Sequence, residues 1–250
     1  HFSYVDSGAN EWHRLSNTFL FDKCLGWEGV CVEPGPQYFA SLRTHRSCRL
    51  VTECLSSSAS TVDFEDAGVN GHVKPQPGHP ASLIQALVGR SRRSSGAGGG
   101  SNATTTATRR VRCNPLHTML RENYAGGGAD PWRSRRVTVD FWSLDVEGLE
   151  LFVLDALDVS KVHVRSLLVE DFWQANRQLD YLLARKGFVK AHQMAADSLY
   201  VSTSDSSALL PPDGRWWYPK GFHRQWEANT KWRRHVKRTE PHRFPEDLRR

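Results

Sequence analysis

Three acidic side chains follow an apolar run, residues 137–144, that is typical of a β-strand. They are Asp145, Glu147 and Glu150, and Gly148 between them permits a tight turn. A carboxylate at a strand end can take a proton from a hydroxyl as a general base, or it can bind a hard cation such as Mg²⁺. In open α/β sheets, ligands bind in the crevice beyond the carboxyl ends of the strands. A plain alternative is a strand followed by a helix with an acidic first turn, which the helix dipole favours.

A second cluster of this kind lies near the N-terminus. Residues 4–10 form a short apolar strand that stops at Asp6 and turns at Gly8, and a further apolar strand stops at Glu33. This spacing is typical of a nucleotide-binding βαβ unit, in which the acid after the second strand binds ribose hydroxyls. A dinucleotide site would need G-x-G-x-x-G, and this turn has Gly8 alone. The stretch therefore argues against NAD or FAD and favours S-adenosylmethionine.

Alternating strands and helices must position these groups. The pattern predicts strands over residues 2–5, 30–33, 48–55, 60–65 (a short edge strand), 137–144 and 164–170. It predicts helices over residues 15–25, 36–45, 82–88, 113–122, 150–157 and 176–185, and a final antiparallel hairpin from 188–194 and 198–202. Such alternation implies a parallel sheet with right-handed crossovers.

Five ordered blocks together resemble the FkbM-type methyltransferases. They are Asp6–Asn10, Leu15–Thr18, Leu25–Pro34, Val111–His117 and Asp140–Glu150. The resemblance runs from about Phe2 to Val201, with an interruption between Gly89 and Arg110. Many family members carry Asp-Gly after the Gly-Ala pair, whereas this chain has Asn10-Glu11-Trp12, so its turn must close without a second glycine.

This resemblance implies an S-adenosylmethionine-dependent O-methyltransferase that acts on a hydroxyl of a small molecule, carbohydrate or glycan. The implied fold is α/β and Rossmann-like, with a mostly parallel seven-stranded sheet, an antiparallel terminal hairpin and helices on both faces. Asp6 and Gly8 are expected under the amino acid end of the cofactor, and Glu33 on its ribose. Further polar contacts to the cofactor are expected from Asn10, Ser16, Asn17, Thr18 and Ser56. For Ser16, Asn17 and Thr18, capping of the helix at 15–25 is the alternative.

Methyl transfer to a hydroxyl requires that the hydroxyl lose its proton. Asp145 is the first candidate for this task, with Glu147 and Glu170 as further catalytic acids. Asp145 and Glu170 could instead hold a divalent cation such as Mg²⁺, and the sequence leaves both mechanisms open. His117 and His192 are alternative bases, although a lone histidine is more often structural. A contrasting hypothesis is a catalytically silent relative that serves as an interaction or trafficking module.

Composition divides the 250 residues into a body and a tail. We expect a methyltransferase domain over 1–205, with a flexible insertion rich in Gly, Ser and Arg at 89–110, and a basic, Trp-rich extension over 206–250. Residues 215–250 hold eleven Lys and Arg against four Asp and Glu, so the net charge of +6 belongs to the tail. The tail could cover an acceptor or bind a polyanion, but the nearly neutral body argues against a nucleic-acid partner.

The cysteines and the chain ends bear on the compartment. Cys48 and Cys54 are expected on one strand, six residues apart and too far apart to bridge there, and Cys31 and Cys54 are expected as small core residues. No stretch approaches the roughly 20 apolar residues of a membrane span. The sequon at Asn102 and a start at His1 without Met, which indicates a fragment, favour the secretory lumen over the cytoplasm.

Overall fold

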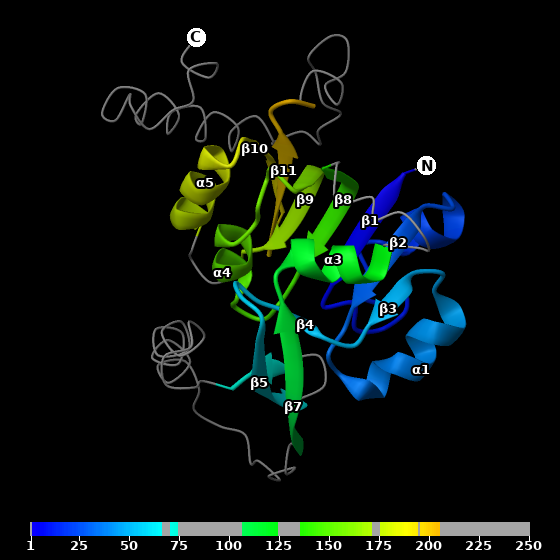
Figure 1. The fold of residues 1–250 in the computed structure, drawn as a ribbon. Coiled ribbons are helices and arrows are strands. Elements are labelled where there is room, and N and C mark those ends of the chain that lie inside the picture. The colour runs from blue at the N-terminus through cyan, green and yellow to red at the C-terminus, as the bar shows by residue number, and fades with distance from the viewer. Residues whose placement is uncertain are drawn as a thin grey trace, which may run out of the picture.

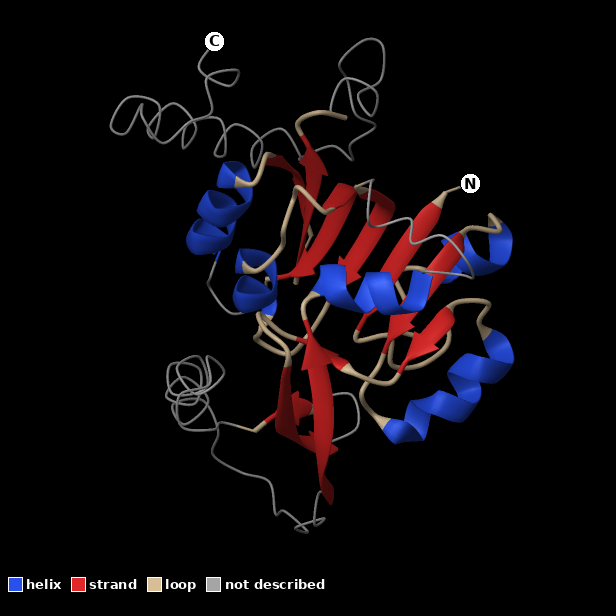
Figure 2. Cartoon of the chain, viewed as in Figure 1, coloured by secondary structure: helices blue, strands red, loops and turns tan. Residues whose placement is uncertain are grey.

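A mixed sheet of seven strands forms the body of the protein (Figure 2). The computed structural model describes residues 2–66, 71–74, 107–124, 136–171, 176–194 and 196–205. Within the sheet the order is β10-β11-β9-β8-β1-β2-β3. The strands are β1 (Ser3–Ser7), β2 (Glu28–Val32), β3 (Arg49–Val51), β8 (Val137–Leu144), β9 (Val162–Glu170), β10 (Phe188–Gln193) and β11 (Asp197–Ser202). Strands β9, β8, β1, β2 and β3 pair in parallel, whereas β11 pairs antiparallel with both β9 and β10. The predicted mostly parallel sheet and its terminal hairpin are confirmed.

The chain changes direction across the sheet at β1. From β1 it passes to β2 and β3 on one side, and it later returns to fill β8 and β9 on the other side. This reversal is the topological switch point at which open α/β sheets bind ligands, outside the carboxyl ends of the strands. The carboxyl ends of β1, β2 and β8 should therefore carry the site.

Helices cover both faces of the main sheet (Figure 1). The helices are α1 (Pro36–His45), α3 (Leu116–Tyr124), α4 (Glu150–Asp155) and α5 (Asn176–Arg185), with a π-helical turn, η1, at Leu20–Cys24. Buried side chains of α3, α4 and α5 pack with Val5 and Trp142 in the larger core. Leu42 of α1 and Phe21 of η1 pack with Tyr4 on the opposite face. The change of face between Tyr4 and Val5 follows the two-residue period of a strand.

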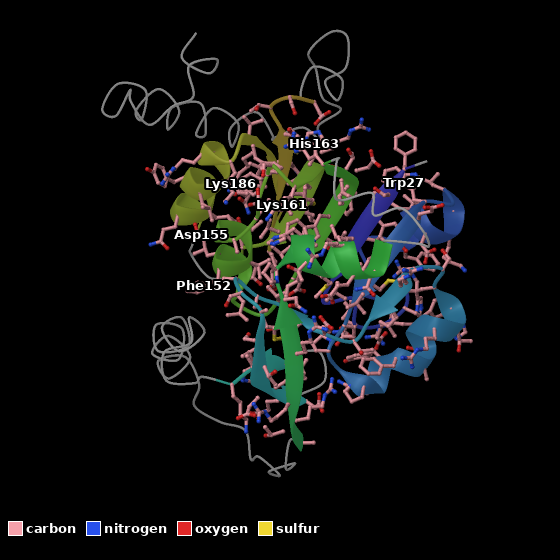
Figure 3. The ribbon with its side chains drawn as sticks, in the orientation of Figure 1. Trp27, Phe152, Asp155, Lys161, His163 and Lys186 are labelled. Atoms are coloured by element: carbon pink, nitrogen blue, oxygen red, sulfur yellow. A yellow bond between two sulfur atoms is a disulfide. The ribbon has the colours of Figure 1, made fainter. Side chains whose placement is uncertain are left out.

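A second sheet lies beyond the carboxyl ends of the parallel strands, below them in Figure 1. Its order is β4-β7-β5-β6, with β4 at Cys54–Leu55, β7 at Ala107–Asn114, β5 at Ser60–Asp66 and β6 at His72–Val73. Figure 3 places Trp27 and His163 at the other end of the main sheet. The second sheet is thus positioned to form a wall over the edge where the site is expected.

Several predicted elements differ from the structure around this second sheet. The strand expected over 48–55 is two strands, β3 and β4, that belong to different sheets. The strand expected at the edge, β5, has partners on both sides. Residues 107–110, expected within the insertion, begin β7, and the helix expected from Cys113 begins at Leu116. Pairing with β5 explains the ordering of residues that have little apolar character of their own.

The helix expected over 15–25 is wrong. Only Leu20–Cys24 is helical, as a π-turn, and no side chain caps it. Ser16 and Thr18 instead direct their hydroxyls to Asp6, so a buried carboxylate takes the groups that the sequence suggested as caps. The other long predicted elements are confirmed, with α1, α5 and β8 at the expected bounds.

The expectation that Cys31 and Cys54 are unbridged core residues is also wrong. Disulfides join Cys31 to Cys48 and Cys54 to Cys113, and Cys24 is exposed and free. The side chains of Cys31 and Cys54 are buried as expected, and Cys48 and Cys54 do not bridge each other, but the apolar runs around Cys31 and Cys54 gave no sign of their partners. The break between β3 and β4 sends Cys48 and Cys54 to partners in two different sheets.

Some predictions lie outside the described residues. These are the helix over 82–88, the insertion from 89 to 106, the sequon at Asn102 and the extension over 206–250. Across the described part of the chain, the helices are all too short or too polar to cross a membrane.

Candidate functional site

The turn after β1 joins three strand ends through the backbone. The amide of Asp145, which follows β8, donates to the carbonyl of Ser7 at 3.0 Å. The amide of Gly8 donates to the carbonyl of Val32 at the end of β2, also at 3.0 Å. Gly8 has φ +76°, and a Cβ atom there would lie 2.0 Å from the carbonyl oxygen of Asp145. Glycine is therefore required both by the backbone conformation and by the close approach of β8.

Glu33 lies directly after β2 and is almost fully buried. Its two carboxylate oxygens accept the backbone N–H groups of Asn10 at 2.8 Å and Gly35 at 2.6 Å. Burial raises the pKa of Glu33 to about 7, although these hydrogen bonds oppose the shift. A carboxylate has about four acceptor positions, so two remain for a ligand. Glu33 thus both closes the glycine turn and keeps acceptor capacity.

Gly8, Glu33 and Asp145 line one hollow between the two sheets. It contains about 630 Å³ free of protein atoms, a figure that includes space open to solvent. From the main body it is also lined by Asn10, Val32, Pro34, Gly35, Gln37, Tyr38, Val146, Glu147 and Leu149. From the second sheet and its connection it is lined by Cys54, Leu55, Phe64, Gly71, His72 and Val73. One wall is therefore mostly apolar, while the strand ends opposite bring acids.

A cluster of carboxylates surrounds the end of β8. One oxygen each of Asp145, Glu150 and Glu170 can lie within 4.8 Å of the other two. The buried Glu150 accepts the amides of Val146 at 2.9 Å and Gly148 at 3.2 Å, which fixes the turn after β8. Chain geometry explains the convergence, since β8 and β9 are parallel neighbours and both end here.

Burial and mutual repulsion disfavour the charged forms of these acids. Burial raises the pKa of Asp145, and it raises the pKa of Glu150 to about 7. The pKa of Glu170 rises to about 8, first through burial and then through the charges of Asp145, Glu150 and Glu147. Asp145 Oδ1 is buried and has no hydrogen-bond partner among the described residues. The cluster is suited to accept a proton or to contact a cation.

Asp6 is held in a buried network of hydroxyls and a guanidinium. Its Oδ2 accepts the hydroxyls of Ser16 at 3.0 Å and Thr18 at 2.6 Å, and the buried guanidinium of Arg46 lies 3.5 Å away. Arg46 also pairs with buried Asp22. This network anchors the segment after β1 behind the glycine turn. Arg46 and Asp22 were missed, because no short motif links residues so far apart in the sequence.

The other sequence-predicted residues divide into two groups. Gly8, Asn10, Glu33, Asp145 and Glu147 line the hollow, and Glu170 joins the acid cluster beside it. The described lining does not include Asp6, Ser16, Asn17, Thr18, Ser56, His117 or His192. Asn17 donates to Ser143 at 3.1 Å, and the hydroxyl of Ser56 donates to the carbonyl of Ser58 at 2.5 Å.

The residues of the apolar wall were missed as site residues. Phe64 and Val73 line the hollow because β5 and β6 fold back over the strand ends through β7, and Leu55 lines it from β4. The alternation around Val62 and Phe64 indicated a strand, but the partner strand begins inside a segment rich in Thr and Arg. Tyr38 and Gln37 reach the hollow from the start of α1, which the sequence placed correctly.

The sheet order, the glycine turn and the acids at three strand ends define a Rossmann-like protein of the methyltransferase class. The sequence model of the methyltransferase FkbM domain matches residues 6–190, and the chain belongs to this family. Among curated proteins, none matches the sequence significantly. A crystal structure of methyltransferase FkbM from Methylobacillus flagellatus KT is similar over 80% of this chain, with 14% identity and a TM-score of 0.41. The chain spans 44% of the length of that protein.

Proposed function

We propose that the chain is an S-adenosylmethionine-dependent O-methyltransferase that acts on a hydroxyl of a carbohydrate or glycan. The observation that carries this proposal is the shared hollow, in which the Gly8 turn, Glu33 and Asp145 meet. Methyl transfer from S-adenosylmethionine to a hydroxyl needs a place for the adenosyl group and a base near the acceptor oxygen. The hollow offers both at the switch point of the sheet.

Each wall of the hollow suits a different part of the cofactor. Glu33 keeps two acceptor positions, and the ribose of S-adenosylmethionine has two hydroxyl donors. Leu55, Phe64 and Val73 provide an apolar surface for the flat adenine ring. Asp145 and Glu147 bring negative charge to the same hollow, which favours a sulfonium cation.

The chemistry assigned to the chain is orientation and proton removal. The bound cofactor supplies an electrophilic methyl group on a positively charged sulfur. Asp145 would take the proton of the acceptor hydroxyl as its oxygen receives the methyl group, with the electron pair of the carbon–sulfur bond left on the thioether product. The raised pKa of Asp145 supports this role, because a base works best with a pKa near the working pH.

The acid cluster also fits a divalent cation such as Mg²⁺. Oxygen ligands are what Mg²⁺ prefers, and Asp145, Glu150 and Glu170 can each offer one. Repulsion among their charges, visible in the raised pKa of Glu170, would be relieved by a cation. A cation there would bind the acceptor oxygen and make its proton easier to remove. The proposal therefore includes a divalent cation, with Asp145 and Glu170 as its ligands.

The disulfides support the lumen of the secretory pathway as the working compartment. Bonds such as Cys31–Cys48 and Cys54–Cys113 persist in oxidising compartments and are rare in the cytosol. Expression with an epitope tag and microscopy would test the location, and a purely cytosolic distribution would contradict it.

The departure from Asp-Gly after Ala9 does not prevent closure of the turn. Asn10 adopts φ +49°, a left-handed conformation that asparagine tolerates, and its amide binds Glu33. The main support for the alternative of a silent relative is therefore weakened. Isothermal titration calorimetry with S-adenosylmethionine tests the proposal first, and absence of binding at millimolar cofactor would contradict it. Methyl transfer to a panel of glycosides tests it second, and binding without transfer would favour the silent relative.

A further inference from the structure

Arg109 places a cation on the inner face of the second sheet. It lies in β7 directly opposite Phe64 of β5, so the two side chains are on the same face of the sheet, and Phe64 lines the hollow. Arg109 is half-buried, whereas its neighbours Thr108 and Arg110 belong to the other face and are exposed. The mostly apolar wall of the hollow therefore carries a permanent positive charge.

The guanidinium of Arg109 reaches from the second sheet to the start of α1, which lies beside β7 (Figure 1). Its Cζ atom is 5.8 Å from the centre of the Phe39 ring. Phe39 follows Gln37 and Tyr38, which line the hollow together with Glu33 just before them in the chain. Arg109 therefore connects the wall to the part of the main body that carries Glu33.

The contacts of this guanidinium hold it in place and leave part of its charge uncompensated. Its Nε atom lies 3.6 Å from Asp66 Oδ2, an ion pair that is longer than a hydrogen bond. The Nε and Nη2 atoms are buried and have no hydrogen-bond partner among the described residues. A charge that is partly removed from water acts more strongly on its neighbours than one in solvent.

Titratable groups from several elements surround Glu33. Burial raises the pKa of Glu33 most, the charge of Asp6 in β1 raises it further, and the charge of Arg109 lowers it. Burial and the charge of Glu33 raise the pKa of Tyr38 in α1. Among these groups, Arg109 is the one that is cationic throughout the neutral pH range. The other titratable residues that line the same hollow are His72 of β6 and Asp145 and Glu147 after β8.

We propose that Arg109 is a positioning residue of the ribose site, and that its positive charge keeps Glu33 in the ionised form that binds the ribose hydroxyls. An ionised carboxylate accepts stronger hydrogen bonds than a neutral carboxyl group. Because the pKa of Glu33 is about 7, a nearby charge changes its ionised fraction most near neutral pH. Arg109 acts through Glu33 and needs no contact with the cofactor. The inference rests on the proposed function, because it assumes that the hollow binds an adenosyl group.

Adenosine binding as a function of pH tests this role. In the parent, the affinity should increase as pH rises through about 7. Arg109→Gln should move the midpoint of this increase upward by about 0.5 pH unit, the scale of one partly screened charge. Above about pH 9, where Glu33 is ionised in both proteins, the affinities should be equal. Arg109→Lys keeps the charge and should leave the midpoint at the parent value. An unchanged midpoint in Arg109→Gln would overturn the proposal.

Arg110→Gln is the matched control. Arg110 follows Arg109 in β7, is exposed and lies opposite Asp63 on the face turned away from Phe64. The substitution removes the same net charge, and the midpoint should stay at the parent value. An equal upward shift in both variants would overturn the proposal. So would a loss of affinity in Arg109→Gln that is the same at every pH, because that result indicates a purely structural role.

Carbon-13 NMR of side-chain carboxyl groups separates this inference from the proposed function, because it needs no ligand. The Glu33 resonance, identified by its loss in Glu33→Gln, should titrate at higher pH in Arg109→Gln than in the parent. Equal titration of Glu33 in the two proteins would overturn the inference even if adenosine binds. If neither S-adenosylmethionine nor adenosine binds the parent at millimolar concentration, the proposed function fails, and the titration then decides the coupling of Arg109 to Glu33 alone.

Discussion

Gly8 and Asp145 are in contact through their backbones, although 137 residues separate them in the chain. A Cβ atom on Gly8 would lie 2.0 Å from the carbonyl oxygen of Asp145, and the amide of Asp145 is held by the carbonyl of Ser7. The cofactor turn and the acid proposed as the base are therefore one rigid unit. Any change that separates β1 from β8 should affect cofactor binding and catalysis together.

Substitution of Gly8 tests this unit. Gly8→Ala should lower the free energy of unfolding by more than about 2 kcal/mol, because strain at positive φ is added to a clash with backbone atoms. Cofactor affinity should fall as well. Gly26→Ala is the matched control, since Gly26 has φ +65° but no atom within 4 Å of a new Cβ. It should cost only about 1–2 kcal/mol in urea unfolding and leave affinity unchanged. Equal costs at the two glycines would contradict the contact.

Substitution of Glu33 tests the ribose contact. Glu33→Gln should weaken cofactor binding by roughly 1–3 kcal/mol, the scale of lost hydrogen bonds to a charged group. Glutamine has only one side-chain acceptor oxygen, so either Asn10 or Gly35 also loses its partner. Glu28→Gln, at an exposed position, is the control and should have no effect on calorimetric affinity. An unchanged affinity in Glu33→Gln would mean that other groups hold the ribose.

The pKa of Glu33 predicts a pH dependence of its own. The value of about 7 in the folded protein is above the ordinary 4.5, so the fold favours the protonated form. The contribution of Glu33 to the stability of the folded protein is complete below pH 4.5, and it is lost as pH rises from about 4.5 to about 7. The affinity for the ribose depends on pH in the opposite direction and should increase as pH rises, because the ionised carboxylate is the stronger acceptor for ribose hydroxyls.

Adenosine is a suitable probe for this dependence, because it has no group that titrates near neutral pH. Its affinity for the parent should increase as pH rises through about 7, and its affinity for Glu33→Gln should stay flat. Calorimetry or a fluorescence competition assay would follow the change. A flat profile in the parent would show that Glu33 does not bind the ribose in its ionised form.

Asp145→Asn should leave the fold intact and remove most turnover. The expected loss in kcat is about 10²–10⁴, which is typical for removal of a general base, and S-adenosylmethionine affinity should fall as well, because a negative charge facing the sulfonium is lost. Asp155→Asn, at an exposed position of α4 (Figure 3), is the control and should keep full turnover. Full activity of Asp145→Asn would place the base elsewhere.

The divalent cation is tested without relying on turnover alone. Mg²⁺ should raise the melting temperature of the parent, because a ligand that binds only the folded state stabilises it, and Glu170→Gln should abolish most of this shift. A chelator should lower turnover, and added Mg²⁺ should restore it. A melting temperature and turnover that do not respond to Mg²⁺ would leave Asp145 as a base that works alone.

The sequence predicted the body of the fold because local patterns and parallel pairing agree there. Asp145 and Glu33 could be placed at strand ends from the apolar runs before them, and Gly8 from its position after β1. The wall of the hollow could not be predicted, because β7 is ordered by pairing with β5 rather than by its own composition. The role of Asp6 was obscured for a similar reason, since Arg46 reaches it from a distant part of the chain.

The central claim is that Glu33 and Asp145 hold opposite parts of one adenosyl cofactor. A crystal structure of the oxidised protein with S-adenosylhomocysteine tests it most directly. We predict the ribose hydroxyls within hydrogen-bond distance of Glu33, the adenine against Leu55 and Phe64, and the sulfur on the side of Asp145. A cofactor bound elsewhere, or a hollow that stays empty at millimolar ligand, would contradict the account.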